Sequence, residues 1–504
     1  MPVYLGGRGE ALKLALAPFF DRVYSAIGGH LSVGREDLTA SLKDVRVGLA
    51  CGATLSENEW WTAELATNLL ARLYPSLSIN GSQKDLERLR RLAVRINPAI
   101  EFCNTAPAEL TIGIGHTTSP AGIWPSANGW FSRLWFAPKS EHGATNPYAA
   151  GASACFAVAE IFRRVFLNRF SDAEVSVSLL TFGKTERDNV GLPEGDFGEV
   201  LLAGIGAVAN SALWTLARDA GRRGRLIALD PEHVEASNLQ RYVLGLFKDA
   251  EHTKPKTWIA ARELRYSAIK VEKAALSLEE YADKHNGIAC PTICISVDNV
   301  ETRRAAQALL PRLVVNGWTG DLALGASSHH SSDERACLAC LYHPQGRSLS
   351  QTEQAARALG LTPERAAALW VTRTPLSQQD ISTAARTLGV DPAELAGWQG
   401  RPLGELYTDV ICGAAPIRLP VVNRVETVPL AHQSALAGVL MAAELVKGTN
   451  PELADLSQRE TLVTWGDVLF PPPSVWVVPR AKEPGCICLD EDYQIAFRDK
   501  WSHK

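Results

Sequence analysis

The sequence predicts an α/β protein built around a doubly wound parallel sheet, and three observations support this fold class. Apolar runs of strand length alternate with helical segments along the chain. One such run, Val200–Ala203, leads into a glycine turn, Gly204-Ile-Gly206, that opens a helix. Another run, Thr292–Ser296, is soon followed by Asp298. This order puts a carboxylate at the carboxyl end of a strand, where sheets of this class bind ligands.

The glycine turn predicts a phosphate site. Glycine lets the backbone turn tightly and approach a phosphate, and the following helix presents free N–H groups and its positive dipole end. A second apolar run ends at Asp230, with Glu232 just beyond it, so the pattern is the start of a nucleotide-binding βαβ unit. NAD sites share this pattern, and an NAD-dependent oxidoreductase is therefore one hypothesis.

The residues after Asp230 favour a triphosphate instead. Two basic motifs follow, Ser-Asn-Leu-Gln-Arg at 237–241 and Lys-Pro-Lys at 254–256. Arginine and lysine hold phosphate oxygens, and a carboxylate such as Asp298 can hold Mg²⁺. A dinucleotide dehydrogenase has no use for this set, so a nucleoside triphosphate is the predicted ligand.

In this order the motifs resemble the adenylation domain of ubiquitin-activating enzymes, which the enzymes activating sulfur carriers for molybdopterin and thiamine synthesis share. The resemblance runs from about Phe197 to Gly448 and implies a Rossmann-like adenylation domain that uses ATP and Mg²⁺. It implies catalytic roles for Arg241, Lys256 and Asp298, with Asp298 as the magnesium ligand. The family has Gln where Tyr242 stands, so that position is not carried over. The implied nucleotide-binding residues are Gly204, Gly206, Asp230, Glu232, Asn238, Arg241, Lys256, Asp298 and Asn299.

Two short cysteine pairs predict a structural zinc site. Cys337 and Cys340 form a Cys-x-x-Cys pair, and Cys486 and Cys488 form a Cys-x-Cys pair. Brought together by the fold, four thiolates make a tetrahedral Zn²⁺ site with no open position for chemistry. Relatives in the resembled family use two Cys-x-x-Cys pairs, so the second pair here is tighter. Unrelated buried thiols are the alternative.

Cys412 is the candidate nucleophile. It lies in Asp409-Val-Ile-Cys-Gly-Ala-Ala-Pro416, with Arg418-Leu-Pro420 close behind, which resembles the segment around the thioester-forming cysteine of ubiquitin-activating enzymes. A polar, helical insertion precedes it, and those enzymes carry their cysteine domain there. The resemblance implies a thioester on Cys412. An ordinary core cysteine is the alternative.

The first part of the chain resembles the second in the order of its predicted elements, but it lacks the functional motifs. It has a strand at Val45–Cys51, a helix at Thr62–Leu73 and a later helix at Ala149–Arg163, but the glycine turn, the ribose acid and the Asp-Asn pair are missing from the matching positions. We therefore predict an inactive, degenerate adenylation-like domain. An unrelated α/β domain is the alternative, and a ubiquitin-conjugating domain is disfavoured because no His-Pro-Asn precedes a cysteine.

The predicted organisation is an inactive domain over 1–187, an active adenylation domain over 197–347 and 415–504, and a helical insertion over 348–414 that carries Cys412. Hydrophobic residues make up 46% of the 504 residues, enough for several cores. The net charge of −4 argues against nucleic-acid binding, and no apolar stretch is long enough to span a bilayer. The 10 scattered cysteines indicate reduced thiols and a cytoplasmic protein.

The resemblance implies an ATP-dependent activating enzyme. The C-terminal carboxylate of a ubiquitin-like protein attacks ATP, and Cys412 takes the acyl group as a thioester for transfer to a ubiquitin-conjugating-like enzyme. Bacterial relatives of this kind resemble components of conjugation operons linked to antiphage defence. A sulfur-carrier adenylyltransferase without thioester transfer and an inactive scaffold are the other hypotheses, and an oligomer is compatible with each.

Overall fold

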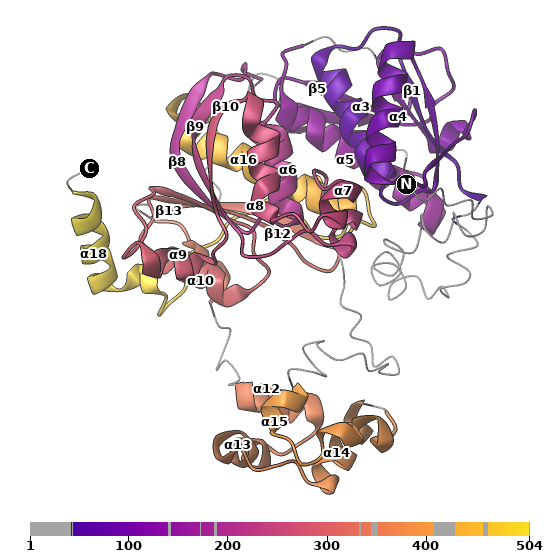
Figure 1. Cartoon of the computed structure of the whole chain (residues 1–504). Helices are drawn as coiled ribbons and strands as arrows, with labels where there is room; N and C mark the ends of the chain where they lie inside the picture. The colour runs from indigo at the N-terminus through magenta and orange to yellow at the C-terminus, as the bar shows by residue number, and fades with distance from the viewer. Residues whose placement is uncertain are drawn as a thin grey trace. The chain divides into compact units, whose positions relative to one another are not determined.

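The computed structural model describes residues 42, 44–139, 143–171, 173–185, 189–331, 334–343, 351–388, 390–407, 429–456 and 462–502. They divide into two compact units, one within Met1–Tyr342 and Thr427–Lys504 and one within His343–Glu426. The first unit holds two α/β domains that pack against each other (Figure 1). Among the described residues, no helix is long and apolar enough to cross a membrane.

The C-terminal domain is built on an eight-stranded sheet of order β10-β9-β8-β11-β12-β13-β14-β15. From β10 to β12 the neighbouring strands run parallel, and from β12 to β15 they run antiparallel. The strands are β8 (Gly195–Ala203), β9 (Arg222–Leu229), β10 (Ala268–Ala274), β11 (Thr292–Ile295), β12 (Leu313–Thr319), β13 (Leu324–His330), β14 (Leu462–Trp465) and β15 (Val477–Val478).

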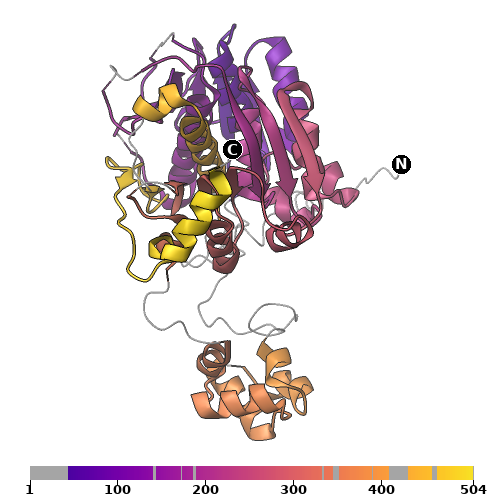
Figure 2. The ribbon, with the colours of Figure 1, turned by 90° about the vertical axis from the view of Figure 1, so that its left-hand side faces the viewer.

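Helices cover both faces of this sheet, as Figures 1 and 2 show. Along β8, Val200 and Leu202 belong to the core beneath α6 and α16, whereas Leu201 and Ala203 belong to the core beneath α9 and α10. A strand that is buried on both faces consists of consecutive apolar residues, and this is the pattern that predicted β8. The helices are α6 (Ala207–Leu216), α7 (Phe247–Glu251), α8 (Lys256–Glu263), α9 (Leu278–Lys284), α10 (Val300–Ala308), α11 (Leu338–Leu341), α16 (Ala431–Thr449), α17 (Pro451–Leu456) and α18 (Glu491–Trp501).

The N-terminal domain has a similar order of strands. Its parallel sheet has the order β3-β2-β1-β4, and a separate antiparallel sheet has the order β5-β6-β7. A single parallel bridge, Ile112↔Ile123, links β4 to the start of β5. The elements are β1 (Val47–Cys51), α3 (Glu57–Leu70), β2 (Ser76–Asn80), α4 (Gln83–Ile96), β3 (Glu101–Phe102), β4 (Thr111–Ile114), β5 (Trp124–Asn128), β6 (Phe131–Trp135), α5 (Pro147–Leu167) and β7 (Val175–Ser178).

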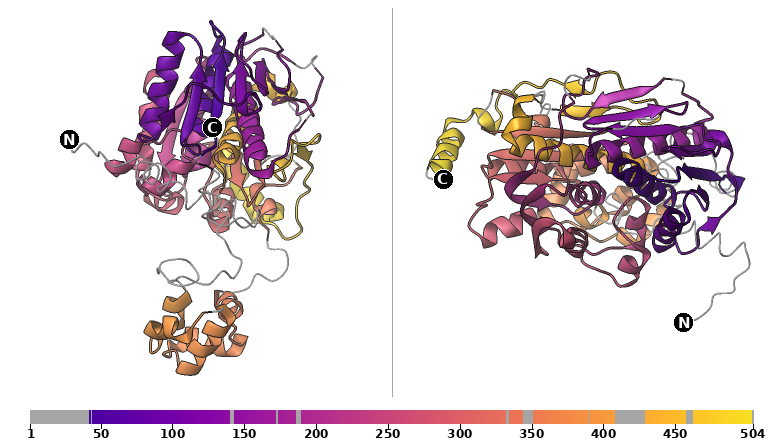
Figure 3. Two further views of the ribbon diagram at one scale, coloured as in Figure 1. Left: turned by 90° about the vertical axis from the view of Figure 1, so that its right-hand side faces the viewer. Right: turned by 90° about the horizontal axis from the view of Figure 1, so that it is seen from above.

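Each of the two domains has a buried cation that binds carbonyl oxygens of the other domain. On α5, Arg163 donates at 3.3 Å to the carbonyl oxygens of Val468 and Phe470, which follow β14. On α16, Lys447 donates to the carbonyl oxygens of Leu179 at 3.0 Å and Leu180 at 3.4 Å, which follow β7. Each domain's long helix therefore holds the corresponding loop of the other domain. Figure 3 shows the two domains side by side.

The predicted fold class is confirmed: an α/β domain precedes a Rossmann-like α/β domain that is interrupted by helices. That the first domain is a copy of the second, and an inactive one, stays a prediction.

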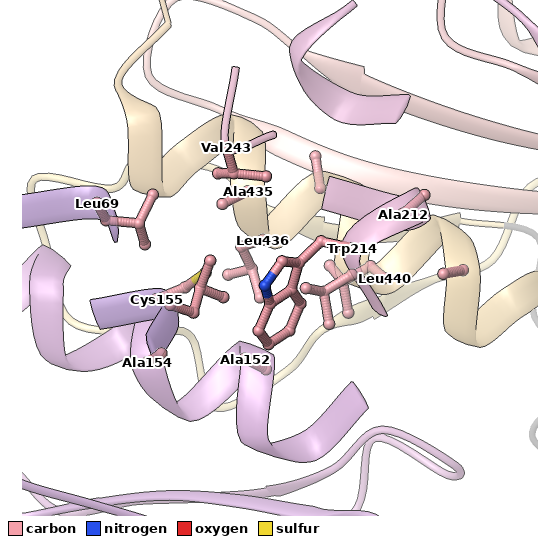
Figure 4. Packing of buried hydrophobic residues seen from close by; sticks show 14 of the residues in the cluster. Leu69, Ala152, Ala154, Cys155, Ala212, Trp214, Val243, Ala435, Leu436 and Leu440 are labelled. Carbon is pink, nitrogen blue, oxygen red and sulfur yellow. The ribbon is translucent and has the colours of Figure 1, made fainter. Parts of the chain in front are cut away.

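The interface between the two domains is a continuous apolar core. Trp214 of α6 packs among small residues of α5, including Ala152, and leucines of α16, including Leu436 and Leu440 (Figure 4). Trp214 is only 1% exposed. Every residue from Pro147 to Arg164 on α5, and from Ala431 to Lys447 on α16, is buried. A helix buried on all sides needs both domains to cover it.

The second unit is helical and has its own small core, which includes Leu359, Leu369 and Leu403. Asp380 pairs with Arg365 at 2.8 Å, and this hydrogen bond lowers the pKa of the Asp380 carboxyl to about 2. Cys412, which we predict to be carried by this insertion, lies outside the described residues. The elements are α12 (Gln351–Leu359), α13 (Pro363–Thr372), α14 (Gln378–Leu388), the 3₁₀ helix η5 (Pro392–Trp398) and α15 (Leu403–Leu406).

Truncating the interface tryptophan tests the shared core. We expect Trp214→Ala to lower the free energy of unfolding by about 3–5 kcal/mol, because it leaves a cavity between the two domains. Tyr266 is 88% exposed, so Tyr266→Ala is the control and should change stability little. Denaturant titration of the full chain measures both. Equal stabilities for the two variants would contradict a shared core.

Candidate active site and metal centre

A cavity of about 490 Å³ opens at the carboxyl ends of β8, β9, β11 and β12. The strand order reverses beside β8, so the loops leaving neighbouring strands diverge and leave a crevice there. Of the predicted nucleotide residues, all except Asn238 line it: Gly204, Gly206, Asp230, Glu232, Arg241, Lys256, Asp298 and Asn299.

The glycine turn forms the floor of this cavity. Gly204 has φ +84°, a conformation that strains any residue with a side chain, and a Cβ there would make a tight contact of 3.1 Å with Val297 Cγ1. Gly206 is the N-cap of α6 and brings no side-chain acceptor to the first helical N–H groups. These groups and the helix dipole leave the turn suited to an anion.

Asp230 ties the glycine turn to the end of β9. Its Oδ2 accepts the backbone N–H of Ile205 at 2.7 Å, and its Oδ1 accepts that of Glu232 at 2.9 Å. Burial raises the pKa of this carboxyl, against the nearby Lys256 and these two backbone donors, which lower it. Each carboxylate oxygen keeps a further lone pair for a ligand hydroxyl.

Lys256 begins α8 and is only 6% exposed, with Nζ bound to the Glu232 carboxylate. Burial disfavours its charge, but Tyr242, Asp230 and Glu232 together raise the pKa of the ammonium group above its ordinary value. Lys256 is therefore a permanent cation at neutral pH. Its position inside the cavity suits it to phosphate oxygens.

Tyr242 is a cavity residue that the sequence reasoning set aside. Its ring centroid lies 5.6 Å from Lys256 Nζ, and a Cβ added to Gly206 would lie 3.8 Å from its Oη. The phenol therefore faces the glycine turn and offers a hydrogen bond to a ligand there. Its place directly after Arg241 was the signal that could have marked it.

Asp298 follows β11, is exposed and also lines the cavity. Asn299 caps α10 by accepting the N–H of Thr302 at 2.6 Å. The buried guanidinium of Arg303 donates to the carbonyl oxygen of Val297 and, at 2.8 Å, to Tyr342 Oη. Arg303 thus fixes the turn that carries Asp298, a role no motif predicts.

Asn238 has a structural contact instead. Its Oδ1 accepts the N–H of Glu235 at 2.9 Å, which shapes the 3₁₀ helix η3 (Ala236–Gln240) before Arg241.

The two cysteine pairs come together as the spacing predicts. The Sγ atoms of Cys337, Cys340, Cys486 and Cys488 all lie within 4.8 Å of one another, and all four residues are buried. The Sγ of Cys337 lies 3.7 Å from that of Cys340 and 3.6 Å from that of Cys486. Four thiolates bound to one zinc at ~2.3 Å would stand ~3.8 Å apart, so the donor set fits tetrahedral Zn²⁺.

Four of the other described cysteines are poor nucleophiles. Burial raises the pKa of the Cys51, Cys290 and Cys294 thiols to about 12 and that of Cys155 also above its usual range. Within the described ranges, Cys103 is the thiol that is only half-buried. The chemistry predicted for Cys412 stays a prediction.

Comparisons with known proteins match each domain separately. The model of the ThiF family matches residues 196–450, and the model named Prokaryotic E2 family C matches residues 51–167. The chain is similar to an uncharacterized protein of Sinorhizobium fredii, y4jF, with 35% identity over 97% of this chain and 98% of the other.

Similarity to solved structures is more distant. E. coli MccB with ATP has 14% identity, covering 73% of this chain and 98% of that chain, with a TM-score of 0.38. E. coli MccB with MccA-N7isoASN has 16% identity, covering 57% and 66%, with a TM-score of 0.35. The E2 match falls on the domain for which the sequence favoured an inactive adenylation-like copy, and it names a class that the sequence reasoning disfavoured.

Metal analysis tests the cysteine cluster. We expect about one zinc per chain, and Cys337→Ser should lose it and lower the melting temperature, because metal binding and folding are coupled. Cys155→Ser is the control, since Cys155 is a buried thiol outside the cluster. A wild-type chain that is free of zinc, and no less stable in chelator, would rule out the site.

Proposed function

The chain belongs to the ThiF family, and on that premise we propose that it is an ATP-dependent activating enzyme for a ubiquitin-like protein. The observation that carries the proposal is the convergence of a bare helix N-terminus, two cations and an exposed carboxylate on one cavity. An NAD-dependent oxidoreductase would not need Arg241 and Lys256 here, whereas a triphosphate uses both. The E2-family match of the N-terminal domain supports a link to a conjugation system.

In the proposed first step, an oxygen of the C-terminal carboxylate attacks the α-phosphorus of ATP. The bond from that phosphorus to the bridging oxygen breaks, pyrophosphate leaves and an acyl adenylate forms. The glycine turn and α6 hold phosphate oxygens, Lys256 and Arg241 neutralise charge, and Asp230 and Glu232 face the ribose. Asp298 would hold Mg²⁺, which supplies charge neutralisation at the phosphates when bound.

In the proposed second step, the Cys412 thiolate attacks the acyl carbon of the adenylate. The bond from this carbon to the phosphate oxygen breaks, AMP leaves and a thioester forms for transfer to a ubiquitin-conjugating-like enzyme. The sequence around Cys412 is the support for this step. A sulfur-carrier adenylyltransferase would stop after the first step.

The proposed division of labour follows the predicted domains. Residues 1–187 form the inactive adenylation-like domain, 197–347 and 415–504 the active one, and 348–414 the insertion with Cys412. The zinc cluster is structural, because four protein ligands leave no position for substrate.

Removing the proposed magnesium ligand tests the nucleotide site. We expect Asp298→Ala to lower carrier-dependent ATP–pyrophosphate exchange by ~100-fold or more while leaving stability unchanged, because Asp298 is exposed and holds the metal rather than the core. Glu301→Ala is the matched control and should leave exchange intact. Glu301 is an exposed neighbouring carboxylate in the first turn of α10. Retained exchange in a folded Asp298→Ala chain would refute the assignment.

The thioester step is tested by Cys412→Ala. This variant should keep pyrophosphate exchange but lose the thiol-sensitive covalent adduct with the carrier on a non-reducing gel, because Cys412 acts only after the adenylate forms. Cys103→Ala is the control and should keep the adduct. An adduct that survives in Cys412→Ala and disappears in Cys103→Ala would move the nucleophile to the N-terminal domain. A wild-type chain that adenylates without any adduct would favour the sulfur-carrier alternative.

A further inference from the structure

A buried arginine of the N-terminal domain contacts the loop that lines the nucleotide cavity of the other domain. Arg72 lies two residues beyond the end of α3 and is 1% exposed. Its guanidinium donates to the carbonyl oxygen of Leu239 and, at 3.1 Å each, to those of Val243 and Gly245. No other residue of the N-terminal domain except Asn68 donates a side-chain hydrogen bond to this loop among the described contacts.

Asn68 completes the contact one helical turn earlier. Its Oδ1 accepts Arg72 Nε at 2.9 Å, and its Nδ2 donates to the Val243 carbonyl oxygen at 2.8 Å. The two side chains therefore act as one donor array. Both are buried, so neither can exchange these partners for water without opening the interface.

The anchored carbonyls bracket the two cavity residues of the loop. Leu239 stands before Arg241 and Tyr242, and Val243 and Gly245 stand after them. Arg241 and Tyr242 line the cavity, whereas the three anchored residues do not. A displacement of the loop would move the Arg241 guanidinium and the Tyr242 phenol away from the glycine turn together.

The buried charge of Arg72 requires that all of its hydrogen bonds to the loop be kept. All four of its acceptors are neutral carbonyl oxygens, and burial lowers the pKa of its guanidinium to about 9, so it stays charged at neutral pH. A buried charge without a counter-ion is tolerated only while its hydrogen bonds are complete. The planar fork can meet several acceptors at once, which a lysine ammonium cannot do in the same geometry.

We propose that Arg72 is a positioning residue for ATP binding, through which the N-terminal domain holds Arg241 and Tyr242 in place in the other domain. This inference rests on the proposed function. It gives the N-terminal domain a role in nucleotide binding that does not depend on any chemistry of its own.

The test compares two interdomain cations in the full chain. Arg72→Met should weaken Mg·ATP binding by ~10-fold or more in calorimetry, with Arg72→Lys between it and wild type. Lys447→Met removes a buried cation that also donates to carbonyls of the other domain, at Leu179 and Leu180, which do not line the cavity. It should keep ATP affinity within about twofold of wild type even where it lowers the melting temperature.

Hydrogen exchange separates positioning from general destabilisation. Without nucleotide, amides in residues 239–245 should exchange faster in Arg72→Met than in Lys447→Met. If Arg72→Met does not fold, Asn68→Ala and Asn58→Ala decide the question. Both asparagines lie on α3 and donate to carbonyls, but Asn58 donates to Ala127 and Ala144 within its own domain. Only Asn68→Ala should weaken ATP binding.

The outcomes distinguish the two proposals. A wild-type chain that binds no Mg·ATP overturns the proposed function and this inference with it. The inference alone is overturned if the wild-type chain binds Mg·ATP and the two variants of a pair both lose ATP affinity in step with their fall in melting temperature.

Discussion

The packing of α16 between the two α/β domains is the contact on which the rest of the first unit depends. α16 is buried along nearly its whole length and contacts α6, α5 and the strands β12 and β13. An apolar helix of this kind has no face to offer to water, so neither domain can present it alone. The charged residues that it carries, Glu444 and Lys447, are paired with each other, and Lys447 also binds carbonyls across the interface. Folding of the domain that holds the cavity is thus linked to folding of its neighbour.

This linkage explains how an open cavity can be held in shape. The cavity walls are loops at strand ends, which have few contacts of their own. Three buried groups hold them in place: Asp230 holds the glycine turn, Arg303 the turn before Asp298, and Arg72 the loop with Arg241. Each of these three contacts is to a backbone group of the turn or loop. Lys256, which also faces the cavity, is bound to Glu232.

The cysteine cluster stabilises a different part of the same domain. Cys337 and Cys340 precede the helical unit in the chain, and Cys486 and Cys488 follow it, so one cluster joins segments that the insertion separates. A four-ligand metal at this point would link the two parts of the first unit that the insertion separates in the chain. The helical unit has a separate small core of its own.

The sequence by itself determined the parts of the site in which chemistry and backbone geometry are local. Gly204 needs its left-handed conformation, Asp298 sits at the end of an apolar run, and the cysteine pairs have ligand spacing, so each leaves a short motif. The apolar runs of the first domain likewise predict the order of its elements. Only the tertiary structure decided the roles of Arg72, Tyr242 and Arg303. Arg72 and its three acceptors in the other domain are more than 160 residues apart, and a cation that binds carbonyl oxygens requires no particular partner residue. Such contacts leave no pattern in a sequence, because every residue has a carbonyl and only the fold determines which ones meet.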